Sequence, residues 1–364
     1  MNGILCISSK NNISLDTYLN YLDYIQHRGK RSFGYLNDSM IHIDGLIKNY
    51  KQYDNYTSPL FLGYTTKYSN NIDTRIECKF GLIDIIIDGE EKYYKIFERV
   101  VNAKDNETIE EGLIEFIKNN DMAYSIILHI NNIIYVMRDK YGFKPLMYTI
   151  NKYGFHVSSE INGYFKYVNI IDVKPGSILK IDKLTLSTIY SESATKKHCL
   201  YEYIDIMNSK TLSNNIDVSI MRDSFIETLA KTEEQTILDT KFRFIVVGIP
   251  NSNVNIAMKY ASYLNIRYEP IILKENSFTL NDTVLNKNII LVSKSENKEL
   301  NTIVNKFNEH GVNELHVRIA SPKIYYHCNN GIENDVSTEI NNYTTIKYIN
   351  LSDIHNDNMC IQCI

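Results

Sequence analysis

The hydrophobic pattern of the chain changes near its middle, and this change limits the fold more than any other feature. The first half carries short apolar runs typical of strands, among them Leu82 to Ile87 and Ser125 to Met137. In this half, apolar residues at helical spacing are confined to two segments. One is capped by Ser14 and should end at Gly29, and the other is Thr108–Lys118. A half so rich in strands predicts sheets packed face to face.

The second half alternates strands with helices, which indicates a parallel, doubly wound sheet. We expect a helix capped by Asp217, helices at 254–264 and 300–310, and strands at 244–248, 268–273, 289–292 and 314–319. Ligands of such sheets bind beyond the carboxyl ends of the strands. A polar stretch at 185–200 is the expected boundary between domains at 1–190 and 191–364.

Composition excludes several classes of partner. The 364 residues are 44% hydrophobic and 23% charged, with a net charge of −4 and no long run of like charges. Nucleic acid and anionic membranes are therefore not expected partners. The sequence has no apolar segment of membrane-spanning length and no basic region before its short N-terminal apolar run, so we expect a cytoplasmic protein. Six scattered cysteines are too few for a disulfide framework.

Short motifs occur in a fixed order along the whole chain. They are Met1–Ile4, Gln26–Gly29, Arg138–Leu146, Ser158–Glu160, Asp172–Gly176, Cys199–Tyr203 and His316–Pro322. Together they resemble the motifs of the glutamine phosphoribosylpyrophosphate amidotransferases, and Cys-x-x-Glu-Tyr is specific to that family. The resemblance implies an α+β domain like the N-terminal nucleophile hydrolases, with stacked antiparallel sheets and helices. An α/β phosphoribosyltransferase-like domain with a parallel sheet should follow, and the resemblance implies a homo-oligomer.

The nucleophile position of the glutaminase half is altered. The family uses an N-terminal cysteine, whereas this sequence has Asn2. A carboxamide cannot ionise to a nucleophile as a thiol can. Cys6 is the alternative nucleophile, but its place inside a predicted strand favours a buried thiol that acts as a small hydrophobe.

Other glutamine-binding positions differ as well. Lys67 stands where the family has the arginine that clamps the substrate carboxylate, and lysine cannot form a bidentate clamp. Asp88-Gly89 replaces the Asn-Gly of the oxyanion hole, and an ionised aspartate would repel the oxyanion. Asp105 matches the aspartate that holds the glutamine ammonium, although a solvated loop residue before the next helix is the favoured interpretation.

The phosphoribosylpyrophosphate loop has lost its acidic pair. Ser293, Lys294 and Ser295 follow the strand where the family has Asp-Asp-Ser, so Mg²⁺ is not expected to bind. Upstream, Ser252 and the helix behind it could bind an anion, but helix capping explains this residue better.

Four cysteines fall where part of the family ligates a [4Fe–4S] cluster: Cys199, Cys328, Cys360 and Cys363. Four thiolates suit such a cluster. They also suit tetrahedral zinc, which is the main alternative, and idle inherited thiols are the third interpretation.

The favoured hypothesis is a catalytically inactive relative with a structural or interaction role, a protein partner and perhaps the cluster. One alternative is an active amidophosphoribosyltransferase of purine nucleotide biosynthesis. Another is a regulatory module that binds a nucleotide in the former phosphoribosyl cleft. Asn2 and the missing acidic pair favour the inactive protein.

Overall fold

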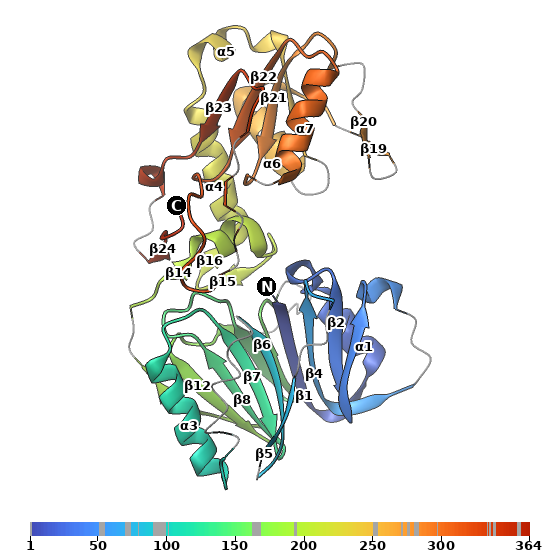
Figure 1. Ribbon diagram of the computed structural model, residues 1–364, viewed down its shortest axis with the longest axis vertical. Helices are drawn as coiled ribbons and strands as arrows, with labels where there is room; N and C mark the ends of the chain where they lie inside the picture. Colours follow the sequence, from blue (N-terminus) through green and yellow to red (C-terminus); the bar gives the residue numbers. More distant parts are fainter. Residues whose placement is uncertain are drawn as a thin grey trace.

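The structure is a computed structural model with two lobes and a junction between them (Figure 1). It describes residues 2–50, 55–69, 74–78, 80–89, 100, 102–161, 169–192, 195–249, 254–270, 272–274, 277–279, 284–296, 298–332, 334, 336–337, 340–354 and 358–364. Ser252 lies outside these residues, so the structure does not describe the anion site considered there.

The N-terminal lobe contains two antiparallel sheets. The first has the order β11-β9-β10-β1-β4-β2-β3, formed by β1 (Asn2–Ser14), β2 (Ser32–Asn37), β3 (Ser39–Asp44), β4 (Thr57–Thr66), β9 (Met147–Asn151), β10 (Gly154–Ser158) and β11 (Ile170–Asp172). The second has the order β13-β12-β8-β7-β6-β5, formed by β5 (Arg75–Cys78), β6 (Gly81–Asp88), β7 (Ser125–Ile130), β8 (Ile133–Arg138), β12 (Ser177–Asp182) and β13 (Thr185–Ser191).

The sheets pack face to face through apolar side chains of both, including Ile4 and Leu62 of the first and Ile127 and Val136 of the second. Helix α1 (Leu15–Asp23) covers the outer face of the first sheet, and α3 (Asn106–Asn119) covers the outer face of the second (Figure 1). The prediction of stacked sheets is confirmed. Burial of apolar surface between these layers is the main source of stability for the lobe.

The C-terminal lobe is built on a parallel sheet, as predicted. Its order is β18-β17-β21-β22-β23, formed by β17 (Phe244–Gly248), β18 (Arg267–Tyr268), β21 (Asn288–Ser293), β22 (Glu314–Ile319) and β23 (Thr345–Tyr348). One face packs on α4 (Val218–Lys231) and α6 (Val254–Leu264), and the other packs on α7 (Lys298–Glu309). The short α5 (Gln235–Asp239) follows α4.

One predicted strand is wrong in its extent. The sequence pattern predicted a strand over 268–273, but β18 ends at Tyr268. Pro270 follows two residues later and has no N–H with which to continue a ladder. Residues beyond it form a separate antiparallel pair, β19 (Ile272–Lys274) with β20 (Ser277–Thr279).

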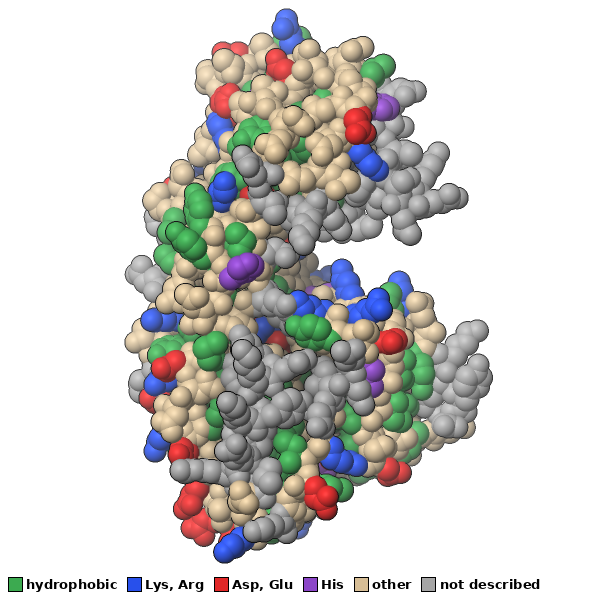
Figure 2. Space-filling model, viewed as in Figure 1, with side chains coloured by type: hydrophobic (Ala, Val, Ile, Leu, Met, Phe, Trp, Pro, Cys, Tyr) green, Lys and Arg blue, Asp and Glu red, His purple; other side chains and the backbone are tan. Residues whose placement is uncertain are grey.

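A junction segment joins the lobes. It contains β14 (His198–Cys199), the π-helical turn η4 (Glu202–Ile206), β15 (Leu212–Ser213), β16 (Ile216–Asp217) and β24 (Met359–Cys360). Strand β1 begins at this level and the C-terminal segment ends there (Figure 1). On one side of the junction the surface is hollowed between the lobes (Figure 2). Within the described part of the chain, no helix has both the length and the apolar character needed to span a membrane.

Candidate functional site

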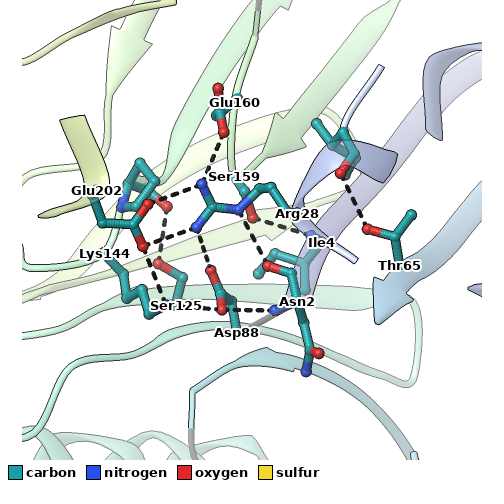
Figure 3. Close-up of polar contacts among 12 residues, drawn as sticks. Asn2, Ile4, Arg28, Thr65, Asp88, Ser125, Lys144, Ser159, Glu160 and Glu202 are labelled. Atoms are coloured by element: carbon teal, nitrogen blue, oxygen red, sulfur yellow. Dashed lines mark hydrogen bonds and ion pairs between the residues drawn. The ribbon is translucent and has the colours of Figure 1, made fainter. Parts of the chain in front are cut away.

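Arg28 lies at the centre of a buried charged network where the N-terminal lobe meets the junction (Figure 3). Its guanidinium donates to Glu160 at 2.8 Å and to Asp88 at 2.9 Å. Arg28 also donates one hydrogen bond of 3.0 Å to each carboxylate oxygen of Glu202. Such a bidentate pair is strong and directional. Because Glu202 belongs to η4, Arg28 ties the sheets to the junction.

Lys144 is the second cation of the network. Its ammonium lies 3.2 Å from carboxylate oxygens of both Asp88 and Glu202. Asp88 also accepts the backbone N–H of Asn2 at 3.1 Å. The Asn2 side-chain amide donates to the carbonyl of Ile87 at 2.8 Å, while its oxygen is buried without a partner among the described residues. The two residues that the resemblance assigns to the nucleophile and oxyanion positions therefore bond to each other in this chain.

Glu160 extends the network toward solvent. One carboxylate oxygen lies 2.9 Å from Nε2 of His27, which is partly exposed. The other accepts the N–H of Asn208 at 2.8 Å and the hydroxyl of Thr211 at 2.6 Å. Burial alone would raise the pKa of Glu160, but these bonds and the charge of Arg28 lower it. The carboxylate is therefore ionised and fully paired.

Asp88 is held ionised by the same balance. Burial would raise the pKa of its carboxyl, but Lys144 and Arg28 outweigh that effect and lower the pKa to about 2. An ionised carboxylate at this position accepts hydrogen bonds and cannot donate one. It would also repel negative charge that develops on a nearby oxygen.

This pKa predicts sensitivity to acid. The pKa of Asp88 is lower in the folded protein than its ordinary value of 3.8, so its stabilising contribution is complete above that value and is lost as the pH falls through about 2. We expect the free energy of unfolding to drop in that window by on the order of 2 kcal/mol more for the native protein than for Asp88→Asn. Urea denaturation at a series of pH values measures this difference. If the free energy of unfolding changes with pH in the same way for both proteins, the pKa of Asp88 is not lowered by its partners.

The other positions that the resemblance assigns to the glutamine site are exposed or half-buried, unlike the buried network. Lys67 is exposed just after β4, with its ammonium 5.4 Å from the ring centre of Tyr68. Gly89 follows β6 in a bend. Asp105 is exposed and caps α3, since its side chain accepts the N–H of Thr108 at 2.9 Å and its hydroxyl at 2.6 Å. Its capping oxygen is thus engaged at the helix terminus.

The loop after β21 is bonded to the junction. Lys294 donates to the carbonyl of Asp205 at 2.9 Å and forms an ion pair of 2.9 Å with its side chain. The hydroxyl of Ser295 donates to the same carboxylate at 2.8 Å, and that of Ser293 donates to the carbonyl of Ser295 at 2.7 Å. Burial would raise the pKa of Asp205, but Lys294 lowers it. These side chains, which the resemblance assigns to the phosphoribosylpyrophosphate loop, are directed at η4.

The four cysteines come together although they are distant in sequence. Cys199 and Cys360 are register partners in the parallel pair of β14 and β24. All four belong to one apolar cluster with residues such as Phe143. Burial raises the pKa of Cys199, Cys360 and Cys363, the last to about 11, so the free thiols are protonated unless a cation stabilises the thiolate.

Two donors of Asn330 point at this sulfur cluster. Its N–H lies 3.4 Å from the sulfur of Cys328, and its side-chain amide lies 3.6 Å from that of Cys360. Four thiols with N–H donors in an apolar setting suit an iron–sulfur cluster. Among the described residues, no group of three or more His, Cys, Asp or Glu side chains is arranged to hold a single metal ion.

Sequence reasoning named Asn2 and Asp88 but missed the charged residues that surround them. Arg28, Lys144 and Glu202 each lie within a recognised motif, and only the fold shows that they share one site. A signal was available for Arg28, a charged residue at the end of the helical segment predicted after Ser14. A charged residue that becomes buried needs a partner of opposite charge. The pairing of Lys294 with Asp205 was missed in the same way.

Fold and site together define a class of protein: a stacked-sheet lobe like a glutamine amidotransferase, joined to a phosphoribosyltransferase-like lobe. Comparison with solved structures supports this class. The glutamine phosphoribosylpyrophosphate amidotransferase of B. subtilis, complexed with ADP and GMP, superposes with a TM-score of 0.75 at 18% identity, covering 99% of this chain and 96% of that one. The allosteric regulatory enzyme of purine biosynthesis gives a TM-score of 0.79 at 16% identity, covering 99% and 94%.

Sequence comparison finds the same family. The amidophosphoribosyltransferase of Pyrococcus horikoshii is 26% identical over 233 residues, which is 58% of this chain and 50% of the relative. That of Methanocaldococcus jannaschii is 25% identical, covering 93% of this chain and 88% of the relative. The chain spans about half the length of the first curated relatives it matches. No protein-family model matches it. The chain is a relative of the amidophosphoribosyltransferases and has their fold.

Proposed function

We propose that the chain is a catalytically inactive relative of the amidophosphoribosyltransferases with a structural or interaction role. The observation that carries the proposal is the state of Asp88, an ionised carboxylate paired with Arg28 and Lys144 at the oxyanion position. Asn2, at the nucleophile position, is bonded to that carboxylate. A site arranged in this way supplies no thiolate, and the side chain at the oxyanion position, Asp88, accepts hydrogen bonds instead of donating one.

The loop after β21 supports the same proposal for phosphoribosyl transfer. In place of two acids that would organise Mg²⁺ and the ribose hydroxyls, it carries Ser293 and Lys294. Lys294 and Ser295 are both engaged with Asp205. A ligand would have to break these contacts, and it would find no carboxylate pair in their place.

The cysteine cluster supports a retained [4Fe–4S] site, held by Cys199, Cys328, Cys360 and Cys363. When bound, the cluster would supply covalent links between three chain segments that are far apart in sequence. The Asn330 donors would orient toward the sulfurs, and Phe143 would help to exclude water. Zinc on the same sulfurs is the alternative.

Calorimetry with phosphoribosylpyrophosphate tests the proposal for the second site. We expect no binding that depends on Mg²⁺ at millimolar ligand, because the loop lacks both acids. A micromolar dissociation constant corresponds to about 8 kcal/mol, which the remaining groups of the loop cannot provide. Mg²⁺-dependent micromolar binding that is lost on Ser295→Ala would contradict the proposal. The matched control is Ser224→Ala, an exposed serine on α4.

A further inference from the structure

Asn330 forms four hydrogen bonds around the four cysteines. Its backbone N–H donates to the sulfur of Cys328 at 3.4 Å, and its side-chain amide donates to the sulfur of Cys360 at 3.6 Å. The same amide nitrogen donates to the side-chain oxygen of Gln362 at 2.8 Å. The carbonyl of Asn330 accepts the N–H of Ala123 at 2.7 Å. Through these bonds one residue links the turn after Cys328 to the C-terminal segment and to the N-terminal lobe.

The contact with Gln362 fixes the direction of the Asn330 amide. A primary amide has two N–H donors on its nitrogen, and one of them is engaged by the oxygen of Gln362. The second N–H is therefore available to the sulfur of Cys360. A cysteine that ligates a metal is deprotonated, so its sulfur carries negative charge and accepts hydrogen bonds. The arrangement suits Cys360 as a thiolate ligand.

The two cysteines that Asn330 contacts are the less buried pair. Cys199 and Cys363 have exposed fractions of 4% and 6%, whereas Cys328 and Cys360 are half-buried. The apolar core shields the first pair more completely than the second. Asn330 therefore supplies hydrogen bonds on the side of the cysteines that apolar packing leaves partly open.

We infer that Asn330 is a positioning residue for the [4Fe–4S] cluster, which holds Cys360 in place and raises the reduction potential. This role rests on the proposed cluster, and Asn330 is not itself a ligand. Hydrogen bonds to the sulfurs are one of the factors that set the potential of such clusters. They stabilise the reduced form more than the oxidised form, because the reduced form carries one more negative charge. Loss of the side-chain donor should therefore make the cluster harder to reduce.

Reductive titration with dithionite, followed by visible absorption on protein purified without oxygen, tests this role. Asn330→Leu has a side chain of similar size but no donor. We expect the equilibrium constant for its reduction to fall about tenfold, which is about 59 mV for a one-electron couple. The matched control is Asn329→Leu, which makes the same change at an exposed side chain of the same turn and should keep the native potential.

A lower potential in Asn330→Leu, with the native potential in Asn329→Leu, supports the role of Asn330. Equal potentials in Asn330→Leu and the native protein, or equal shifts in both leucine variants, overturn it. If Asn330→Leu loses its iron, Asn330→Gln keeps an amide donor and should retain more iron, and equal loss in these two variants also overturns the role. Iron content is measured first, because native protein without iron refutes the proposed cluster itself, whereas bound iron with an unchanged potential refutes the role of Asn330 alone.

Discussion

Replacement of Arg28 by leucine is expected to lower the free energy of unfolding by about 3–5 kcal/mol, which is typical for removing one partner of a buried ion pair. The guanidinium of Arg28 contacts three carboxylates, and all these side chains are fully buried. Leucine would leave Lys144 alone to offset Asp88 and Glu202, while Glu160 would keep His27. Uncompensated charge in a low-dielectric interior has a large desolvation penalty.

Urea denaturation of Arg28→Leu beside Arg31→Leu measures this effect. Arg31 is an exposed arginine close in sequence, so its substitution should change the free energy of unfolding by well under about 1 kcal/mol. If Arg28→Leu does not fold, Arg28→Lys keeps the charge but loses the bidentate fork, and it should fall between the two. Equal stabilities for Arg28→Leu and Arg31→Leu would show that the network does not hold the lobes to the junction.

We expect Cys363→Ser to lose both its iron and part of its stability. Protein purified without oxygen should be brown and hold about four iron atoms per chain, as a [4Fe–4S] cluster requires. The variant should be colourless, and its Tm should fall by roughly 10 °C, which corresponds to about 3 kcal/mol lost when distant segments are no longer linked. Cys360→Ser should behave alike, because Cys360 lies in the same sulfur cluster.

The control for this experiment is Cys78→Ser, a buried cysteine of another core, whose thiol lies 3.1 Å from the carbonyl of Gly81. It should keep its iron and its colour. Native protein without iron, or equal iron loss in the Cys78 control, would refute the cluster. A colourless native protein with about one zinc ion per chain would favour the zinc alternative.

Local signals explain why much of the fold could be predicted from the sequence. Ser14 caps α1 with a hydrogen bond to the N–H of Thr17, as its position before an amphipathic run suggested. Asn131 and Asn132 turn between β7 and β8 with positive φ, a conformation that asparagine tolerates. The edge strand β23 was not predicted, because its burial comes from β22 and not from an apolar pattern of its own.

The candidate site was harder to predict, because its contacts join residues that are distant in the chain. Arg28 and Glu202 are 174 positions apart, and Lys294 and Asp205 are 89 apart. Sequence reasoning could say that Asp88 was the wrong residue for an oxyanion hole. It could not say that the ionised Asp88 would be paired with Lys144 and Arg28, since that pairing depends on how the sheets pack against η4.

Release of glutamate from glutamine by the purified protein is the decisive measurement. We expect no release above a buffer blank, with or without phosphoribosylpyrophosphate and Mg²⁺. Asn2→Cys should not restore it, because Lys67 and the ionised Asp88 remain. Steady release by the native protein that disappears in Asn2→Ala would contradict the claim that this chain is inactive.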